Sequence, residues 1–133
     1  MKPNREKIFN KFSGHCAYCG CELEKGWHVD EIKPVGRIYS YDEFNRNRKR
    51  WTGKYEHPEN LNFENQVPSC PSCNINKHGM SIEHFRQVIE HFIISLNRDF
   101  TQYKIAKRYG LIKETGNKVK FYFEDGENEH PHP

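Results

Sequence analysis

The sequence predicts a single α+β domain held together by a cluster of cysteines. At 133 residues the chain has the length of one domain. Only 35% of its residues are hydrophobic, and the mean hydropathy is −1.01, so a core alone offers little stabilisation to a fold of this size. The five cysteines are the obvious groups to supply the additional stabilisation, through a metal or disulfides. Segments with helical and with alternating periodicity both occur, which predicts mixed α and β structure.

Helical patterns occur before, between and after the cysteine-rich segments. Ser81 is a good N-cap for the longest of them, in which apolar residues recur at near-3.6 spacing. Gly110 is expected to end the helix that follows it. Four helices are expected: residues 5–12, a short helix between Cys70 and Gly79, residues 82–96 and residues 101–109.

Two segments are predicted to be strands. Residues 27–35 lie between glycines and run into Pro34, and residues 118–123 alternate like a half-buried strand. Residues 56–68 are rich in turn formers and are expected to be loop and irregular strand. The polar, proline-bearing segment 124–133 is predicted to be a disordered tail, which leaves residues 1–123 as the domain.

Two C-x-x-C pairs, Cys16 with Cys19 and Cys70 with Cys73, predict a structural zinc site. Two residues between cysteines let both sulfurs reach one ion at ~2.3 Å, and two pairs complete a tetrahedral four-thiolate site. Such an ion would clamp two distant parts of the chain, where closing a loop stabilises most in principle. A redox pair or incidental thiols are the alternatives, and the presence of two pairs disfavours both. Cys21 is expected to be a free thiol, with replacement of Cys19 as a ligand as the alternative.

Three further features accompany the cysteine pairs: Asp30 on a strand that runs into a proline, Asn65 before Cys70, and the run Cys73-Asn74-x-x-Lys77. In this order they resemble the HNH endonucleases, or ββα-metal nucleases, in the zinc-stapled form of short bacterial and phage proteins. The resemblance covers about residues 16–77 and continues weakly into segments that look like the C-terminal part of a phage-type subgroup. It implies a ββα-metal core with a four-cysteine zinc site and a helical C-terminal extension.

The resemblance implies a metal-dependent phosphodiesterase. It assigns a catalytic divalent ion, Mg²⁺, Mn²⁺ or another, to Asp30 and Asn74, where the ion would contact the scissile phosphate and stabilise the leaving 3′ oxygen. Asn65 matches an asparagine that positions the strand or the base. Lys77 lies one helical turn beyond Asn74 on the same face, where it is expected to meet phosphate charge.

The sequence departs from the family pattern at Glu31, where the family has the histidine that acts as general base. Glutamate, with an ordinary pKa of ~4.3 against ~6.5 for histidine, is the weaker base at neutral pH. Three interpretations stay open. Glu31 serves as a substitute base with a shifted pKa. His28 takes the role, because positions 28 and 30 share a face of a regular strand. Alternatively, the site is catalytically weak and the scaffold serves as a binding module.

The densest basic and aromatic group lies between the two halves of the predicted site. It consists of Arg46, Arg48, Lys49 and Arg50, with Trp51 and Tyr55 nearby. The cations are expected to neutralise phosphates and the aromatic rings to stack on unpaired bases. An ordinary solvated face is the alternative. His78, next to Lys77, is a further candidate for a phosphate contact.

Bulk properties limit the partners and the compartment. A net charge of +3 and a pI of 8.6 permit a nucleic-acid partner without establishing one. The charged N-terminus has no apolar run of signal-peptide length, so a cytoplasmic protein of a bacterial or phage-infected cell is expected. No stretch approaches the ~18 apolar residues of a membrane span, so no membrane partner is expected.

The predicted function is hydrolysis of DNA phosphodiester bonds, by nicking or by double-strand cleavage, with RNA as a second substrate to consider. The alternative is a catalytically impaired HNH-like zinc module that binds nucleic acid or a protein partner. A third prediction is a component of a phage DNA-packaging machine. The sequence predicts neither the target site nor the oligomeric state.

Overall fold

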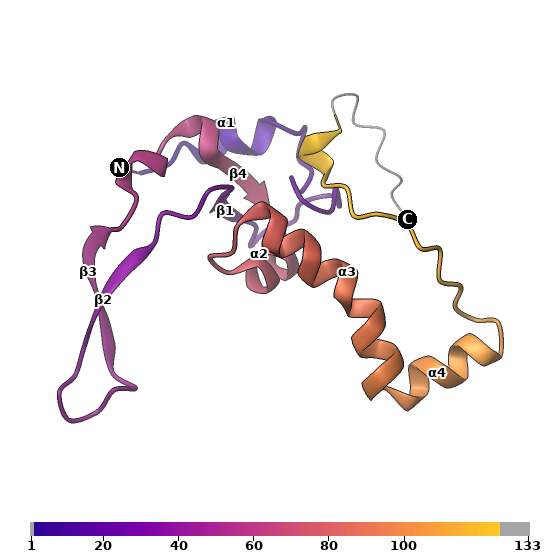
Figure 1. The fold of residues 1–133 in the computed structure, drawn as a ribbon. Helices are drawn as coiled ribbons and strands as arrows, with labels where there is room; N and C mark the ends of the chain where they lie inside the picture. The colour runs from indigo at the N-terminus through magenta and orange to yellow at the C-terminus, as the bar shows by residue number, and fades with distance from the viewer. Residues whose placement is uncertain (1, 126–133) are drawn as a thin grey trace.

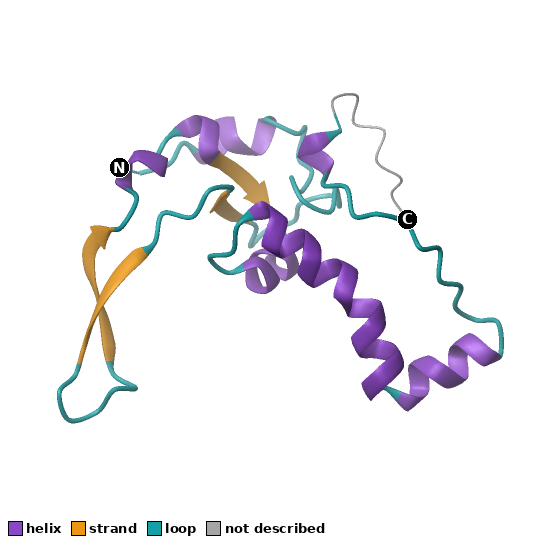
Figure 2. Cartoon of the chain, in the orientation of Figure 1, coloured by secondary structure: helices purple, strands orange, loops and turns teal. Residues whose placement is uncertain are grey.

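The structure, a computed structural model, describes residues 2–125. It is mixed α and β with small sheets, as predicted (Figures 1 and 2). In chain order the helices and strands are α1 (Arg5–Asn10), β1 (His28–Glu31), β2 (Arg37–Tyr41), β3 (Lys49–Tyr55), β4 (Gln66–Ser69), α2 (Pro71–Lys77), α3 (Ile82–Asp99) and α4 (Thr101–Arg108). Short 3-10 turns occur at Pro58–Asn60, Phe63–Asn65 and Tyr122–Glu124.

The strands form two separate antiparallel pairs. β1 pairs with β4, and Asp30 lies opposite Val67. β2 pairs with β3, and Tyr39 lies opposite Trp51. The β1–β4 ribbon lies at the centre of the molecule close to α2, whereas the β2–β3 hairpin projects away from the body on one side (Figure 1). The central ribbon and α2 therefore form the part of the fold that can support a site.

The core is small and largely aromatic. Tyr18, Phe85 and Phe121 are at most 2% exposed. Their ring centroids lie 5.4–5.7 Å apart, in edge-to-face and stacked pairs. Such pairs stabilise the fold by more than the burial of their apolar surface alone. The core thus joins the segment between the first two cysteines, the start of α3 and the C-terminal end of the described chain.

All four predicted helices are present, with small shifts at their ends. α1 ends two residues earlier than predicted, at Asn10, and α3 continues to Asp99. The Ser81 side chain accepts a hydrogen bond from the backbone N–H of His84, 3.2 Å away, so it caps α3 as expected. The predicted strand 27–35 is shorter, and the two strands of the hairpin were not predicted.

The predicted strand over residues 118–123 is wrong. This segment runs back along the molecule without a partner strand and then turns at Tyr122–Glu124. Phe121 and Tyr122 are both buried, so the alternation of the sequence is not followed. The Cys16–Cys19 loop holds this segment in place, because the backbone N–H groups of Tyr122 and Phe123 donate to the carbonyls of residues 18 and 17.

Arg86 attaches this C-terminal segment to α3. Its guanidinium donates to the carbonyl oxygen of Val119 at 2.7 Å and forms an ion pair with Glu124 at 2.6 Å. Glu124 therefore belongs to the fold, although the predicted tail began there. Residues 126–133 of that tail lie outside the described residues. Among the described helices, none combines the length and apolar character needed to cross a membrane.

We expect Phe85→Ala to lower the free energy of unfolding by ~3–5 kcal/mol, because it removes buried apolar surface and leaves a cavity. Urea unfolding followed by circular dichroism measures the loss. Phe92→Ala is the matched control on the same helix. Phe92 is 40% exposed, so its loss should stay below ~1 kcal/mol. Equal losses for the two variants would contradict the position of the core.

Candidate functional site: a cysteine cluster and a polar pocket

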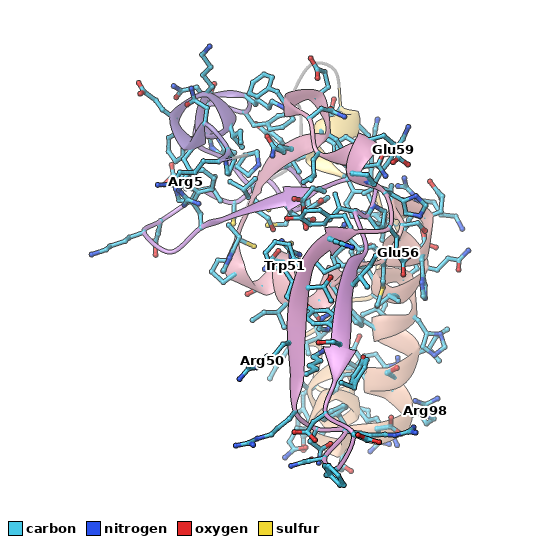
Figure 3. The ribbon with its side chains drawn as sticks, turned by 90° about the vertical axis from the view of Figure 1, so that its left-hand side faces the viewer. Arg5, Arg50, Trp51, Glu56, Glu59 and Arg98 are labelled. Atoms are coloured by element: carbon cyan, nitrogen blue, oxygen red, sulfur yellow. The ribbon has the colours of Figure 1, made fainter. Side chains whose placement is uncertain are left out.

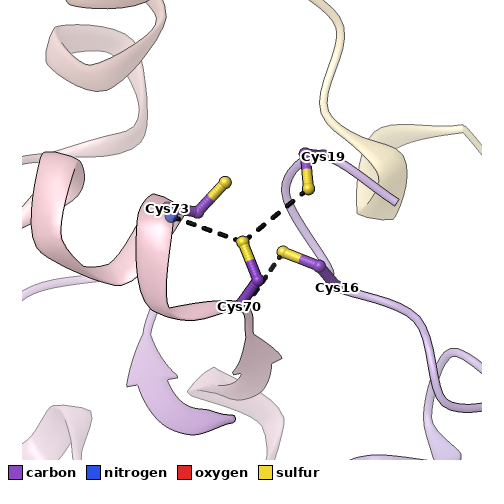
Figure 4. A group of neighbouring side chains, drawn as sticks. All are labelled: Cys16, Cys19, Cys70 and Cys73. Carbon is purple, nitrogen blue, oxygen red and sulfur yellow. Dashed lines mark hydrogen bonds between the residues drawn. The ribbon is translucent and has the colours of Figure 1, made fainter. Parts of the chain in front are cut away.

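The four cysteines of the two C-x-x-C pairs lie together in one cluster. Their sulfur atoms are all within 4.8 Å of one another, and the Sγ atoms of Cys19 and Cys70 are 3.8 Å apart. A tetrahedral site with metal–sulfur bonds of ~2.3 Å has edges of ~3.8 Å. The four side chains converge from the Cys16–Cys19 loop and from the start of α2 (Figure 4). The cluster can therefore hold a metal ion and is compatible with zinc.

Local backbone geometry prepares the cluster. Gly20 adopts a φ of +78°, which a glycine reaches without strain, and its N–H donates to the carbonyl of Cys16 at 2.9 Å. Cys70 caps α2, and its sulfur accepts from the N–H of Cys73 at 3.4 Å. Pro71 occupies the first turn of α2, where a missing N–H costs nothing.

Four thiols this close cannot all ionise without a positive charge. Hydrogen bonds from Cys19 and Cys73 lower the pKa of the Cys16 thiol. Hydrogen bonding to Cys16 is the main cause that raises the pKa of the Cys19 and Cys73 thiols above their usual range. Without a cation, the protein thus favours a thiolate at Cys16 over thiolates at Cys19 and Cys73. A divalent cation supplies the charge that lets the others ionise, since thiolates are the metal-binding form.

Next to the cluster, β1 and α2 border a pocket of about 580 Å³. Three of the predicted catalytic and metal-binding residues, His28, Asp30 and Glu31, line it from β1, and Asn74 lines it from α2. The structure therefore brings together side chains that belong to separate motifs in the sequence. The roles assigned to them stay predictions.

Asp30 is held by two groups from different parts of the chain. It is 7% exposed. Its Oδ2 accepts a hydrogen bond from the buried Tyr18 hydroxyl and lies 3.1 Å from Nζ of Lys77. Among residues 2–125, the hydrogen bond and ion pair described for this carboxylate both go to Oδ2. Because burial of a carboxylate is costly unless it is paired and hydrogen-bonded, Tyr18 and Lys77 are what makes this position tolerable.

Lys77 is itself buried, with 1% of its surface exposed. Besides the contact with Asp30, its ammonium group donates to the backbone carbonyl of Glu31 at 2.9 Å. The contact between Lys77 and phosphate stays a prediction. What the structure adds is that Lys77 joins α2 to β1.

Glu31 and His28 differ in their surroundings. Glu31 is half-buried, and burial together with the charge of Asp30 raises its pKa, while Arg37 and Lys77 act in the opposite direction. His28 is exposed at the pocket lining. Both remain candidates for the base.

Asn65 lies outside the pocket lining, and its side chain forms hydrogen bonds with backbone groups. Its Oδ1 accepts from the N–H of Lys33 at 2.8 Å, and its Nδ2 donates to the carbonyls of Lys33 and Asn60. These bonds secure the chain just beyond β1. The geometry fits the strand-positioning part of the role that the family resemblance implies.

Four of the five predicted phosphate-binding cations, all except Lys77, lie on the projecting hairpin. Arg46 and Arg48 are in the loop that joins β2 to β3, and Lys49 and Arg50 begin β3. All four are exposed, and none lines the pocket.

Three residues of the site were not predicted from the sequence. Arg37 and Tyr39 line the pocket, and Tyr18 holds Asp30. The position of Tyr18 between Cys16 and Cys19 places it near the cysteine cluster, yet no sequence pattern indicates that its hydroxyl reaches a strand twelve residues later.

Comparison with known proteins gives a distant relative among curated proteins. No family model matches the chain, and no solved structure matches it. The chain is similar to the protein of Bacillus subtilis (strain 168) named "SPbeta prophage-derived putative HNH endonuclease YoqL", with 26% identity over 122 residues. The match covers 92% of this chain and 44% of that protein, so the chain spans less than half of its length. The likeness supports a relationship to HNH endonucleases.

We expect the purified protein to contain one tightly bound zinc ion per chain, measured by inductively coupled plasma mass spectrometry. Cys73→Ser removes one of the four sulfurs and should release the ion and lower the melting temperature, since binding of a structural metal contributes directly to folding. Cys21→Ser is the matched control and should retain zinc, because Cys21 lies outside the cluster. Full zinc retention by Cys73→Ser would contradict the site.

We expect Lys77→Met to destabilise the protein by ~3–5 kcal/mol, because it leaves the buried Asp30 carboxylate without its cation. Chemical unfolding measures this loss. Addition of Asp30→Asn should recover part of it, since the uncompensated charge is then gone. Lys33→Met, at an exposed position near the same strand, should change stability by less than ~0.5 kcal/mol. A loss in the double variant equal to the sum of the single losses would argue against the pair.

Proposed function

We propose that this chain is a metal-dependent endonuclease that hydrolyses phosphodiester bonds of DNA. The observation that carries the proposal is that Asp30 and Asn74 line one pocket, together with Glu31 and His28. Carboxylate and amide oxygens are suitable ligands for hard divalent cations such as Mg²⁺. The likeness to the Bacillus protein supports the same class of activity.

The residues of the pocket divide the work as follows. Asp30, through Oδ1, and the side-chain oxygen of Asn74 would hold Mg²⁺, Mn²⁺ or another divalent ion. When bound, such an ion supplies Lewis-acid stabilisation to the scissile phosphate and to the leaving 3′ oxygen. Tyr18 and Lys77 bind the other oxygen of Asp30 and so restrict the orientation of the ligand, as outer groups around metal sites commonly do.

Glu31 or His28 would accept the proton of the attacking water. Both line the pocket beside Asp30, and either requires only a hydrogen-bonded water to act. Asn65 secures the segment after β1 and thereby helps to position Glu31. Departure of the 3′ oxygen would leave a 5′ phosphate and a 3′ hydroxyl.

The exposed cations of the hairpin would bind the substrate backbone. Arg46, Arg48, Lys49 and Arg50 can each neutralise phosphate charge, which gives salt-dependent affinity without sequence preference. The name of the Bacillus relative describes it as prophage-derived, which fits a phage origin for this chain. Participation in DNA packaging stays a prediction.

A second candidate is a catalytically impaired zinc module that binds nucleic acid. The contact between Lys77 Nζ and Asp30 Oδ2 favours it, because a carboxylate already paired with a cation attracts a metal ion less strongly. Glu31 in place of the family's histidine points in the same direction.

We expect the protein to nick or linearise supercoiled plasmid when Mg²⁺ or Mn²⁺ is present, and Asp30→Asn to abolish the reaction. Loss of the general base costs ~10²–10⁴-fold in rate. Whichever of Glu31→Gln and His28→Ala shows this loss on agarose gels therefore identifies the base. His84→Ala, exposed on α3 away from the pocket, is the control. DNA binding without cleavage under any divalent ion would support the second candidate instead.

A further inference from the structure

One face of the β2–β3 hairpin carries aromatic and cationic side chains in a row. The register sets Tyr39 opposite Trp51 and Tyr41 opposite Lys49. Because successive side chains of a strand point to opposite faces, alternate positions Arg37, Tyr39 and Tyr41 of β2 share a face. Cationic and aromatic side chains are mixed on this face, whereas a face that packs into a core carries mainly apolar side chains.

Contacts between the side chains show that Tyr55 belongs to the same face, despite the irregular register after Arg37. The rings of Trp51 and Tyr55 lie 5.2 Å apart between centroids. The Arg37 guanidinium is 5.9 Å from each of these rings, and Nζ of Lys49 is 4.4 Å from the ring of Tyr39. Cations and rings are thus interleaved along the whole ribbon.

Large parts of these rings are open to solvent. Trp51 is 46% exposed and Tyr41 is 61% exposed. β2 and β3 pack chiefly on each other within the described chain, whereas Tyr39 and Tyr55, nearer the body, are partly buried. Cross-strand pairs such as Tyr39 with Trp51 do stabilise a ribbon, but this function does not account for Tyr41, which has no ring partner among the described aromatic pairs.

The face begins at the candidate active site. Arg37 and Tyr39 line the pocket that also contains Asp30 and Asn74. From there the face continues along the hairpin toward the cationic loop that contains Arg46. The hairpin projects from the body in Figure 1, and Figure 3 shows Trp51 in its upper part and Arg50 extending sideways from it. A strand of nucleic acid leaving the pocket would therefore run along this ribbon.

We propose that the aromatic face of the hairpin, Arg37, Tyr39, Tyr41, Lys49, Trp51 and Tyr55, binds unpaired nucleotides, so that the substrate is single-stranded or branched DNA rather than continuous duplex. Exposed bases stack on aromatic side chains while cations bind the backbone, the usual combination in proteins that bind single strands. Duplex DNA keeps its bases inside and offers Trp51 no ring to stack on. The position of the scissile phosphate rests on the proposed nuclease function, whereas the stacking surface does not.

Tryptophan fluorescence tests the face directly, because the chain has two tryptophans. In the full chain carrying Trp27→Phe, only Trp51 reports. We expect oligothymidylate to quench its emission, and a blunt duplex of equal length to quench little and to bind at least ~10-fold more weakly at the same salt concentration. The matched control is Trp51→Phe, in which Trp27, packed against Phe9 and Arg5 on another part of the molecule, should stay unquenched.

A second variant separates binding from hairpin stability. Tyr41→Thr removes an exposed ring without a described ring partner and should weaken oligothymidylate binding while circular dichroism stays unchanged. Equal affinity for single strand and duplex with unquenched Trp51 overturns the proposal, even if plasmid is cleaved. Quenching by oligothymidylate without any cleavage supports the stacking face and overturns the nuclease function alone.

Discussion

The four-cysteine cluster is the constraint on which the rest of this structure depends. It joins the loop that carries Cys16 and Cys19 to the start of α2, more than fifty residues later. The same loop carries Tyr18 to the carboxylate of Asp30, and the same helix carries Asn74 and Lys77 to the pocket. The cysteine cluster thus positions both β1 and α2, the two elements that border the candidate site. The aromatic core adds to this but is too small to hold the two elements in place alone.

The parts of the fold that could be predicted from the sequence are those marked by a local pattern or by a motif of fixed spacing. Helix α3 has a capping serine and a regular apolar period, and both features act within a few residues of chain. The cysteine cluster follows from spacing, because two thiols with two residues between them can share an ion whatever lies between the pairs. The family resemblance implied that Asp30 and Asn74 meet, and the structure places both at the lining of one pocket.

What the sequence did not indicate depends on contacts between distant segments. Residues 118–123 alternate like a strand, but no strand of the described chain pairs with them, and they bind the Cys16–Cys19 loop instead. The burial of Lys77 is equally invisible in the sequence, because a lysine after a helical turn ordinarily faces solvent. The hairpin strands escaped detection because both of their faces are exposed, which removes the alternation of burial that identifies strands.

The way the β2–β3 ribbon is attached has a consequence for how such a protein can diverge. Its strands rest mainly on each other, so loop length and side-chain identity there can change with little effect on the packing of the body. Under the proposed function, target choice and hydrolysis would be encoded largely in different parts of one short chain, which meet where Arg37 and Tyr39 line the pocket. Exchange of the outer part of the ribbon would then redirect the protein to another nucleic-acid shape while the cysteine cluster is inherited intact.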